Sequence, residues 1–518
     1  MKDKTSRQLV EIGGCTGHKT IQLLSVIIGI ALLIWMIIIS AKDGVKIDNI
    51  HAKTMDNEIV VSWDISNVLL CDSIEVEIRH GGVIEDVISL YPSSDQYIYR
   101  TGKHGEKYQF SIYAVCKDVR KSFGMASAMF LGYKELPSSI PILDITTYSG
   151  NDPSYKVLLH PNEETMGDTI TDNYYLKGYA VSDCLPTEIP YELEIKVRGN
   201  GSTLQEKNSY KLKFDRTVSF ACVNNLVFES KEWLLLNNAD SLNTIVGNEI
   251  CRYCDIDWTM DICLTNVMVN GDWKGLYYLT PAITKDNSSA RINSSGYLIE
   301  SDIYWWDKNG LYFETGINEV EKPYFRWTFK YPSIKYIDDE RVHNIKDYLE
   351  DFEKELNEGD EWQEYIDVNS FAKWALARDI IGVHDGAGSN MFYYKENYNV
   401  ASPTSTKLMM GPVWDFDSAF LRVDAYSSIS APYFKELFKK DEFSDIYWNL
   451  YNEKSVDLVC HIDQYMDLLY DDFGVGIDES WLLENARYEK TIVPYNEQRK
   501  VISSWLLSRT IWLDNEMK

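Results

Sequence analysis

One stretch near the amino terminus limits what the rest of the chain can fold into. Residues 21–40, "IQLLSVIIGIALLIWMIIIS", contain no charged side chain. A helical run of this length crosses a bilayer, whose hydrocarbon core is about 30 Å thick. A cleaved secretory signal has a shorter apolar region and a small-residue cleavage site, and only a poor site is present near "IISAK". The sequence therefore predicts an uncleaved transmembrane anchor at 21–40.

The charges beside this segment predict its orientation. Residues 1–20 are net positive, whereas the ten residues that follow the apolar run are balanced. The charged side chains of the first segment are Lys2, Lys4, Arg7 and Lys19, set against Asp3 and Glu11. By the positive-inside rule, residues 1–20 form a cytoplasmic tail. We expect a single-pass membrane protein whose main domains lie outside the cytoplasm.

Composition narrows the class of partner. The formal net charge of −28 argues against nucleic acid, because phosphate binding requires a basic surface. Hydrophobic residues make up 45% of the chain and aromatic residues 13%, as in folded domains. A length of 518 residues is sufficient for two or three such domains.

Cysteine usage is compatible with an oxidising compartment. Of the nine cysteines, Cys15 falls on the cytoplasmic side, and the other eight could form pairs. Cys251 and Cys254 form a single CxxC without a second ligand pair, so zinc is disfavoured. We interpret them as helix-borne core cysteines.

After the apolar run, alternating segments such as "NEIVVSWDIS" and "EKYQFSIYAV" predict short β-strands. Residues 45–135 resemble a fibronectin type III domain, which implies a small all-β sandwich used as a spacer or interaction module. Spacing alone does not show whether Cys71 and Cys116 are bridged. "KELPSSIP" at 134–141 predicts a linker.

From residue 138 to 518 the pattern alternates strands and helices, which predicts an α+β domain. Residues 191–214 predict a hairpin whose polar turn holds Gly199 and Gly201. An ordinary hairpin is the favoured interpretation from these residues alone. The functional alternative is a phosphate-binding loop, with charge supplied by Arg198, Lys207 or Lys211.

Further segments place the later motifs. Residues 266–279 predict a hairpin with an Asn-Gly turn at Asn270 and Gly271. Residues 344–356 predict a helix with a solvated acidic face; its core face comprises Ile345, Tyr348, Leu349, Phe352 and Leu356. Residues 369–382 predict a second helix that begins at an N-cap Ser370 and stops at Gly382.

Two loops then carry an ordered set of polar residues. "VHDGAGSNMFYYKE" separates Asp385 from Asn390 by five positions, and its strand is expected to pair with "KLMMGPV". "GPVWDFDSAF" follows with Asp415 and Asp417. Phosphoryl transfer needs a carboxylate that accepts the hydroxyl proton, and an amide and a carboxylate that hold divalent metal. Each motif alone is weak, because Asp, Gly and Asn are common in turns.

The ordered stretches make 138–518 resemble the spore-coat protein H (CotH) kinase family, a set of atypical protein-kinase-like domains. They are "VRGNGSTLQEKNSYKLKF", "WLLLNNADSLNTIVGNEI", "VNGDWKGLYYLT", "GYLIESD", "FKYP", "HDGAGSNMFYYK" and "GPVWDFDSAF". The resemblance implies ATP and Mg²⁺ or Mn²⁺ as cofactors, and surface or coat proteins as substrates. Its implied roles are catalysis for Asp385, metal binding for Asn390 and Asp415 with help from Asp417, and phosphate contact for Lys207 or Lys211.

Three positions depart from the family pattern. Pro281 replaces a Glu that would be a natural partner for a phosphate-positioning Lys, and Gly247 replaces an Arg. Asn208 replaces the second Lys of a pair in the first hairpin. Two functions therefore remain open. The first is a membrane-anchored kinase that acts on extracytoplasmic Ser or Thr, and the second is a weak or inactive kinase fold that serves as a surface interaction protein.

Overall fold

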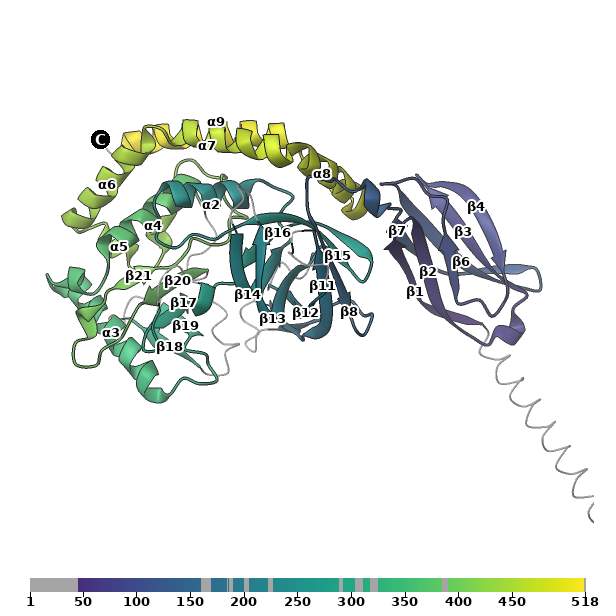
Figure 1. The fold of residues 1–518 in the computed structure, drawn as a ribbon, viewed down its shortest axis with the longest axis horizontal. Coiled ribbons are helices and arrows are strands. Elements are labelled where there is room, and N and C mark those ends of the chain that lie inside the picture. The colour runs from purple at the N-terminus through teal and green to yellow at the C-terminus, as the bar shows by residue number, and fades with distance from the viewer. Residues whose placement is uncertain are drawn as a thin grey trace, which may run out of the picture. The chain divides into compact units, whose positions relative to one another are not determined.

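The computed structural model describes residues 45–159, 169–183, 185, 190–199, 205–221, 227–287, 292–302, 311–316, 325–383 and 390–516. They fall into two compact units, divided between Lys134 and Glu135 (Figure 1). The anchor predicted at 21–40 and the tail at 1–20 lie outside the described residues. Within the described ranges, no helix is long and apolar enough to cross a bilayer.

The first unit is an all-β sandwich region. One sheet has the order β1-β2-β5 and the other the order β4-β3-β6-β7. The strands are β1 (Lys46–Met55), β2 (Glu58–Ser66), β3 (Ser73–His80), β4 (Val83–Leu90), β5 (Gln96–Tyr99), β6 (Lys107–Cys116) and β7 (Val119–Met129). Alternating residues of both sheets, Val61 and Phe110 among them, form its core. The finer assignment to fibronectin type III stays a prediction.

Cysteines are mostly reduced in the described part of the chain. Cys71 and Cys116 are free thiols, so the bridge that the sequence left open is not formed. Cys251 and Cys254 are also free and buried; Cys251 lies in a helix, as predicted, and Cys254 follows as the C-cap of that helix. Cys263 is disulfide-bonded.

The second unit begins with a closed barrel of order β11-β12-β13-β14-β16-β15-β8. Its strands are β8 (Ile142–Thr147), β11 (Leu176–Ser182), β12 (Tyr191–Arg198), β13 (Ser209–Ala221), β14 (Val227–Leu236), β15 (Cys263–Val269) and β16 (Asp272–Pro281). β8 and β15 are parallel, and the other neighbours are antiparallel. β9 (Tyr155–Leu159) and β10 (Thr169–Asn173) form a separate pair. Side chains that point inward, including Trp233 and Tyr277, fill the barrel.

Both predicted hairpins are strand pairs of this barrel. β12 and β13 form the first, with Arg198 opposite Ser209 at the turn end. β15 and β16 form the second, and Asn270 (φ 52°) and Gly271 (φ 75°) make its turn. Positive φ at both turn residues matches the right-handed twist of the strands, which is why Asn-Gly favours a tight hairpin.

The rest of the second unit packs helices on a five-stranded sheet of order β18-β19-β17-β20-β21. The strands are β17 (Tyr297–Ser301), β18 (Tyr312–Thr315), β19 (Phe325–Tyr331), β20 (Met391–Lys395) and β21 (Leu408–Met410). The helices are α2 (Asn243–Tyr253), α3 (Asp339–Glu358), α4 (Val368–Ile381), α5 (Phe434–Leu437), α6 (Asp441–Ser455), α7 (Leu458–Leu469), α8 (Val475–Tyr488) and α9 (Tyr495–Glu516). α7 packs on α2 and α9, and α8 packs on β16 of the barrel (Figure 1). β20 pairs with β21, as predicted.

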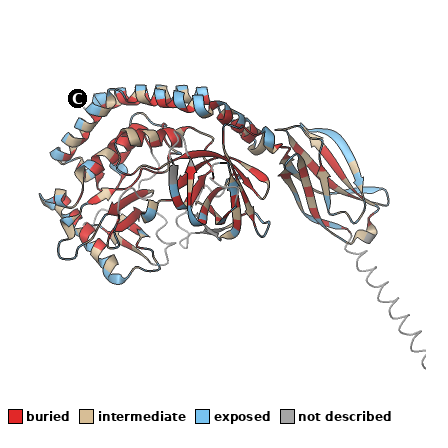
Figure 2. Cartoon of the chain, viewed as in Figure 1, coloured by how far each residue is buried: buried red, intermediate tan, exposed pale blue. Residues whose placement is uncertain are grey.

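α4 is buried over most of its length from Ser370 on, whereas the outer face of α9 is exposed (Figure 2). α4 ends at Gly382, whose φ of 66° is the left-handed conformation of a helix C-cap, as predicted. The predicted N-cap was wrong: Asp367, not Ser370, caps the helix, and its carboxylate accepts the Ser370 N–H at 2.9 Å. The Ser370 hydroxyl instead accepts the Met410 N–H at 3.1 Å.

A buried carboxylate on α4 ties several segments together. Asp379 accepts the backbone N–H groups of Ser427 (2.6 Å) and Ser428 (2.8 Å), and the Ser428 hydroxyl at 2.6 Å. The Tyr447 hydroxyl of α6 donates to it at 3.1 Å. Arg509 of α9 donates to the Asp379 carbonyl at 2.7 Å. Four donors therefore offset the cost of burying this carboxylate.

The five apolar residues predicted on the core face of α3 are all buried. Glu353 is buried with them, although the sequence placed it on the solvated acidic face. Its Oε1 accepts the hydroxyl hydrogens of Thr315 (2.5 Å) and Tyr433 (3.0 Å). Burial raises the pKa of Glu353 to about 7, and these two hydrogen bonds only partly oppose the shift.

This shift makes a prediction about stability and pH. The folded state holds the Glu353 proton more tightly than the unfolded state, whose pKa is near 4.5. Folding should therefore lose stability as the pH rises from about 4.5 to about 7, by roughly 3 kcal/mol. Glu353→Gln should remove that loss. Urea unfolding of both proteins at pH 4.5, 6 and 8 measures it; a constant difference across the three pH values would show that Glu353 titrates normally.

Candidate active site

The structure brings together two of the predicted metal-binding residues. Asn390 immediately precedes β20, and Asp415 follows β21 after four residues. The Asn390 amide donates to the Asp415 carboxylate, Nδ2 to Oδ2, at 2.9 Å. Both residues have left-handed backbones, with φ of 58° and 64°. Because β20 and β21 form a hairpin, their two loops lie at the same end. Asp385, the predicted catalytic residue, lies outside the described residues.

Asp417 faces a different partner. Phe416 separates the two acidic residues in the sequence, and its side chain is 2% exposed and lies against Gly247. Asp417 accepts a hydrogen bond from the Asn238 amide, which also donates to the Thr244 hydroxyl at 2.8 Å. The two carboxylates of "WDFD" therefore serve two places: Asp415 faces Asn390, and Asp417 faces the loop before α2.

Arg198, at the end of β12, lies near these carboxylates. Burial lowers the pKa of its guanidinium, and the negative charges of Asp415, Glu300 and Asp417 oppose that shift. The guanidinium carbon lies 5.9 Å from the centre of the Trp414 ring. The predicted cation of the first hairpin is thus placed beside the predicted metal-binding loop.

The sequence analysis missed three charged residues of this region. Glu300 lies on the buried strand β17, Asp302 follows that strand, and Lys330 comes from β19. Lys330 Nζ lies 2.7 Å from Glu300 Oε2, and the Thr328 hydroxyl donates to Asp302 at 3.0 Å. Burial disfavours the Lys330 ammonium, but Glu300 and Asp302 outweigh it and raise its pKa. The sequence does contain a signal for these residues. "GYLIESD" is an apolar strand that ends in two acidic residues, and "FKYP" places one lysine in another apolar strand.

The two lysine candidates occupy different environments. Lys211 is half-exposed on the outer face of the barrel and pairs with Glu232 at 2.6 Å. Lys207 is 2% exposed. Its Nζ donates to Glu484 Oε1 and to the Leu276 carbonyl, both at 2.6 Å. Of the two, Lys207 lines a pocket.

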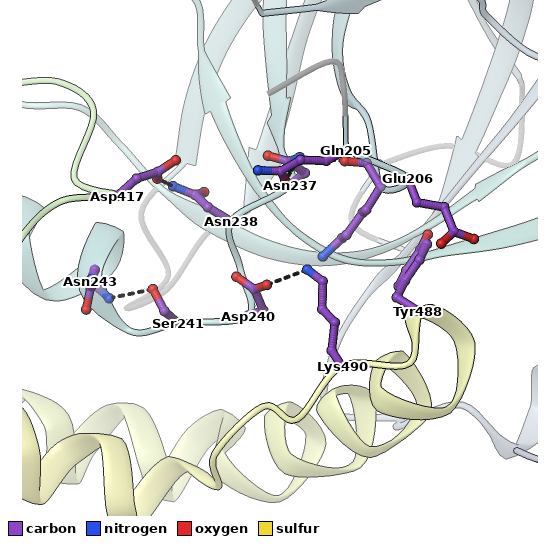
Figure 3. Close-up of a pocket in the computed structure, with 11 residues that line it drawn as sticks. Gln205, Glu206, Asn237, Asn238, Asp240, Ser241, Asn243, Asp417, Tyr488 and Lys490 are labelled. Carbon is purple, nitrogen blue, oxygen red and sulfur yellow. Dashed lines mark hydrogen bonds and ion pairs between the residues drawn. The ribbon is translucent and has the colours of Figure 1, made fainter. Parts of the chain in front are cut away.

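That pocket has a volume of about 430 Å³, a size typical of small-molecule sites. It lies between the start of β13, the loop before α2 and the end of α8 (Figure 3). An ion pair between Asp240 and Lys490 (2.7 Å) crosses one side. Its lining is Gln205, Glu206, Lys207, Asn237, Asn238, Asp240, Ser241, Asn243, Asp417, Tyr488 and Lys490. Asp417 links this polar pocket to the loop that carries Asp415.

The side-chain oxygens of Asn390 and Asp415 suit a hard divalent cation. Asn390 and Asp415 offer amide and carboxylate oxygens, the ligand types that Mg²⁺ and Mn²⁺ prefer. In the described part of the chain, however, no group of three or more His, Cys, Asp or Glu side chains is arranged to hold a metal.

Two departures from the family pattern have structural explanations. A Cβ at Gly247 would lie 2.4 Å from Cδ1 of Phe416, so glycine makes room for the ring between the two acids. Residue 281 lies opposite Trp233, on the inward register of the barrel, whereas Lys211 lies opposite Leu234 on the outward one. Residue 281 is also five residues, or about 17 Å along the strand, beyond Leu276, whose carbonyl accepts a hydrogen bond from Lys207. A Glu at 281 would not reach either lysine.

Comparison with known proteins identifies a kinase-like protein. A family model described as "CotH kinase protein" matches residues 195–458, just over half of the chain. The chain therefore belongs to the CotH kinase family. No curated protein matches it.

Two solved structures are similar to this chain. Titin kinase with its flanking domains is 9% identical, with 90% of this chain and 75% of that chain covered and a TM-score of 0.17. The twitchin kinase region from C. elegans is 11% identical, with 90% and 72% covered and a TM-score of 0.17. TM-scores this low carry no argument about fold or function.

The Gly247–Phe416 contact can be tested by overpacking. Gly247→Ala gains up to about 1 kcal/mol of helix propensity but should lose roughly 1–3 kcal/mol because Phe416 must shift. We expect net destabilisation in guanidinium unfolding. The same change in a Phe416→Leu background should be neutral or stabilising. A more stable Gly247→Ala protein in the original background would show that Phe416 leaves room there.

Proposed function

We propose that this chain is a membrane-anchored protein kinase that transfers the γ-phosphate of ATP to Ser or Thr of extracytoplasmic or surface proteins. The observation that carries the proposal is the contact between Asn390 and Asp415. It joins two loops in the order that phosphoryl transfer requires. Membership of the CotH kinase family supports it.

The proposed mechanism assigns one task to each group. Asp385 accepts the proton of the substrate hydroxyl. Asn390 and Asp415 would hold a divalent cation through their oxygens, and the Asn390 amide also orients the Asp415 carboxylate. Bound Mg²⁺ or Mn²⁺ would neutralise charge on the phosphates of ATP. Arg198 adds positive charge beside that loop, and Lys207 adds it at the wall of the pocket.

A second candidate is a weak or inactive kinase fold that serves as a surface interaction protein. Asn208 favours it, because it stands where the family pattern has a second Lys and so removes one positive charge near the proposed phosphate site. The two candidates differ in one measurable property, because only the first requires metal-dependent nucleotide binding.

Three variants of the full-length protein test the kinase proposal. Asp385→Asn should abolish phosphate transfer and leave metal–nucleotide binding nearly unchanged, because a proton acceptor is not a principal ligand. Asp415→Asn should weaken Mg²⁺-dependent ATP binding by about tenfold or more, since it removes a ligand charge. Asn390→Ala should have a milder effect of the same kind.

The matched control is Asp424→Asn, a nearby carboxylate that is 74% exposed. Radiolabelled transfer, ATP binding with and without metal, and melting temperature should be measured on the same samples. Wild-type transfer by Asp385→Asn would eliminate the kinase proposal. Equal loss of stability without any separation of binding from turnover would favour purely structural roles.

We also propose that residues 21–40 anchor the protein with 1–20 in the cytoplasm, and that 45–135 is a fibronectin type III-like spacer. The uncharged run and its flanking charges support the first statement. The three- and four-stranded sheets support the second. Protease added to intact cells should digest residues 45–518. Protection of that whole region would reverse the proposed orientation.

A further inference from the structure

The partner of Lys207 comes from a distant part of the chain. Glu484 lies on α8, 277 residues further along. It is also outside residues 195–458, which the family model matches. The two side chains are 1% and 0% exposed, so their 2.6 Å contact is shielded from solvent. At such burial an unpaired charge is strongly disfavoured, and each group depends on the other.

The barrel is shaped to receive this carboxylate. Gly275 has φ of 113°, a conformation that favours glycine. A Cβ there would lie 2.5 Å from Glu484 Oε1 and 3.1 Å from Lys207 Cε. The Leu276 N–H donates to the same Oε1 at 2.7 Å. The missing side chain at Gly275 therefore leaves room for the Glu484 carboxylate, and both the Leu276 N–H and the Lys207 ammonium donate to its Oε1.

The Lys207–Glu484 pair is not needed to hold α8 against the barrel. One turn further along the same helix, Arg487 makes two hydrogen bonds to Asp272 of β16, at 3.0 and 2.9 Å. Lys274 adds a third contact to Asp272 at 2.7 Å. The helix is thus already fastened to the barrel. Two of the three ammonium protons of Lys207 have partners within the described residues, Glu484 and the Leu276 carbonyl.

We propose that Glu484 is a positioning residue of the phosphotransfer site, which holds the Lys207 ammonium charged at the pocket wall so that its third N–H can contact a nucleotide phosphate. This inference rests on the proposed kinase function. In this arrangement Glu484 of α8 is the carboxylate partner of Lys207. A Glu at residue 281 is therefore not needed for that role.

Glu484→Gln tests the inference in the full-length protein. The amide keeps the oxygen that accepts the Leu276 N–H but removes the counter-charge. ATP should bind about tenfold or more weakly, the size of one charge-assisted contact. Affinity should also fall with rising pH more steeply than in the wild type, because the unpaired Lys207 ammonium deprotonates. A purely structural role would not produce that pH profile.

Asp272→Asn is the matched control, because it breaks a second buried ion pair of α8 with the barrel, the one between Arg487 and Asp272. It should lower the melting temperature and leave ATP affinity unchanged in the folded protein. In a Lys207→Met background, Glu484→Gln should have no further effect on ATP affinity. If Glu484→Gln does not fold, Glu484→Asp retains the charge but withdraws it by one methylene, and should weaken ATP binding while Asp272→Asn does not.

The outcomes separate the two proposals. If the wild type binds ATP with metal but Glu484→Gln and Glu484→Asp bind it equally well, the positioning role is wrong and the kinase proposal stands. If the losses in the Lys207→Met background are additive, Glu484 acts on the structure and not through the lysine. If the wild type binds no nucleotide, both proposals are overturned.

Discussion

The Asp379 carboxylate lies fully buried in α4, where it accepts hydrogen bonds from the 427–428 backbone, the Ser428 hydroxyl and Tyr447. α4 leads into the loop of Asp385, and the segment before Ser427 begins at the loop of Asp415. This one carboxylate therefore fixes the end of α4 against the segment that follows the loop of Asp415. An unpaired carboxylate at this depth would cost several kcal/mol, so the four donors cannot be lost singly without consequence.

Local signals in the sequence were enough for much of the fold. The Asn270-Gly271 turn, the Gly382 helix stop and the β20–β21 pairing all depend on residues close together in the chain. The contact between Asn390 and Asp415 followed from the order of two loops around one hairpin. The N-cap of α4 was misplaced because Asp367 and Ser370 are both good caps three residues apart. Only the packed structure shows which one faces the helix end.

Other parts of the site had no local signal. Glu353 was expected on the solvated acidic face of its helix, but it is buried and accepts hydrogen bonds from Thr315 and Tyr433 of other elements. The partner of Lys207 could not be found, since no pattern links residues 277 positions apart. By contrast, strand alternation alone separates Lys211 from the inward-facing Tyr210 and Leu212, and could have placed it on the outer face. The glycine at position 247 is explained by packing, because Phe416 occupies the space that a side chain there would fill.

Lys395 shows what burial does to a lysine that has no carboxylate partner among the residues that the structure describes. It is fully buried on β20, where its ammonium donates to the Thr406 carbonyl and lies 4.2 Å from the centre of the Tyr348 ring. Burial lowers the pKa of Lys395 to about 7. Lys207 is buried to a similar degree, and burial lowers its pKa as well, but Glu484 opposes that shift. A lysine that must meet a phosphate as a cation needs such a counter-charge. Glu484 of α8 therefore supplies the counter-charge of a lysine that lines the pocket.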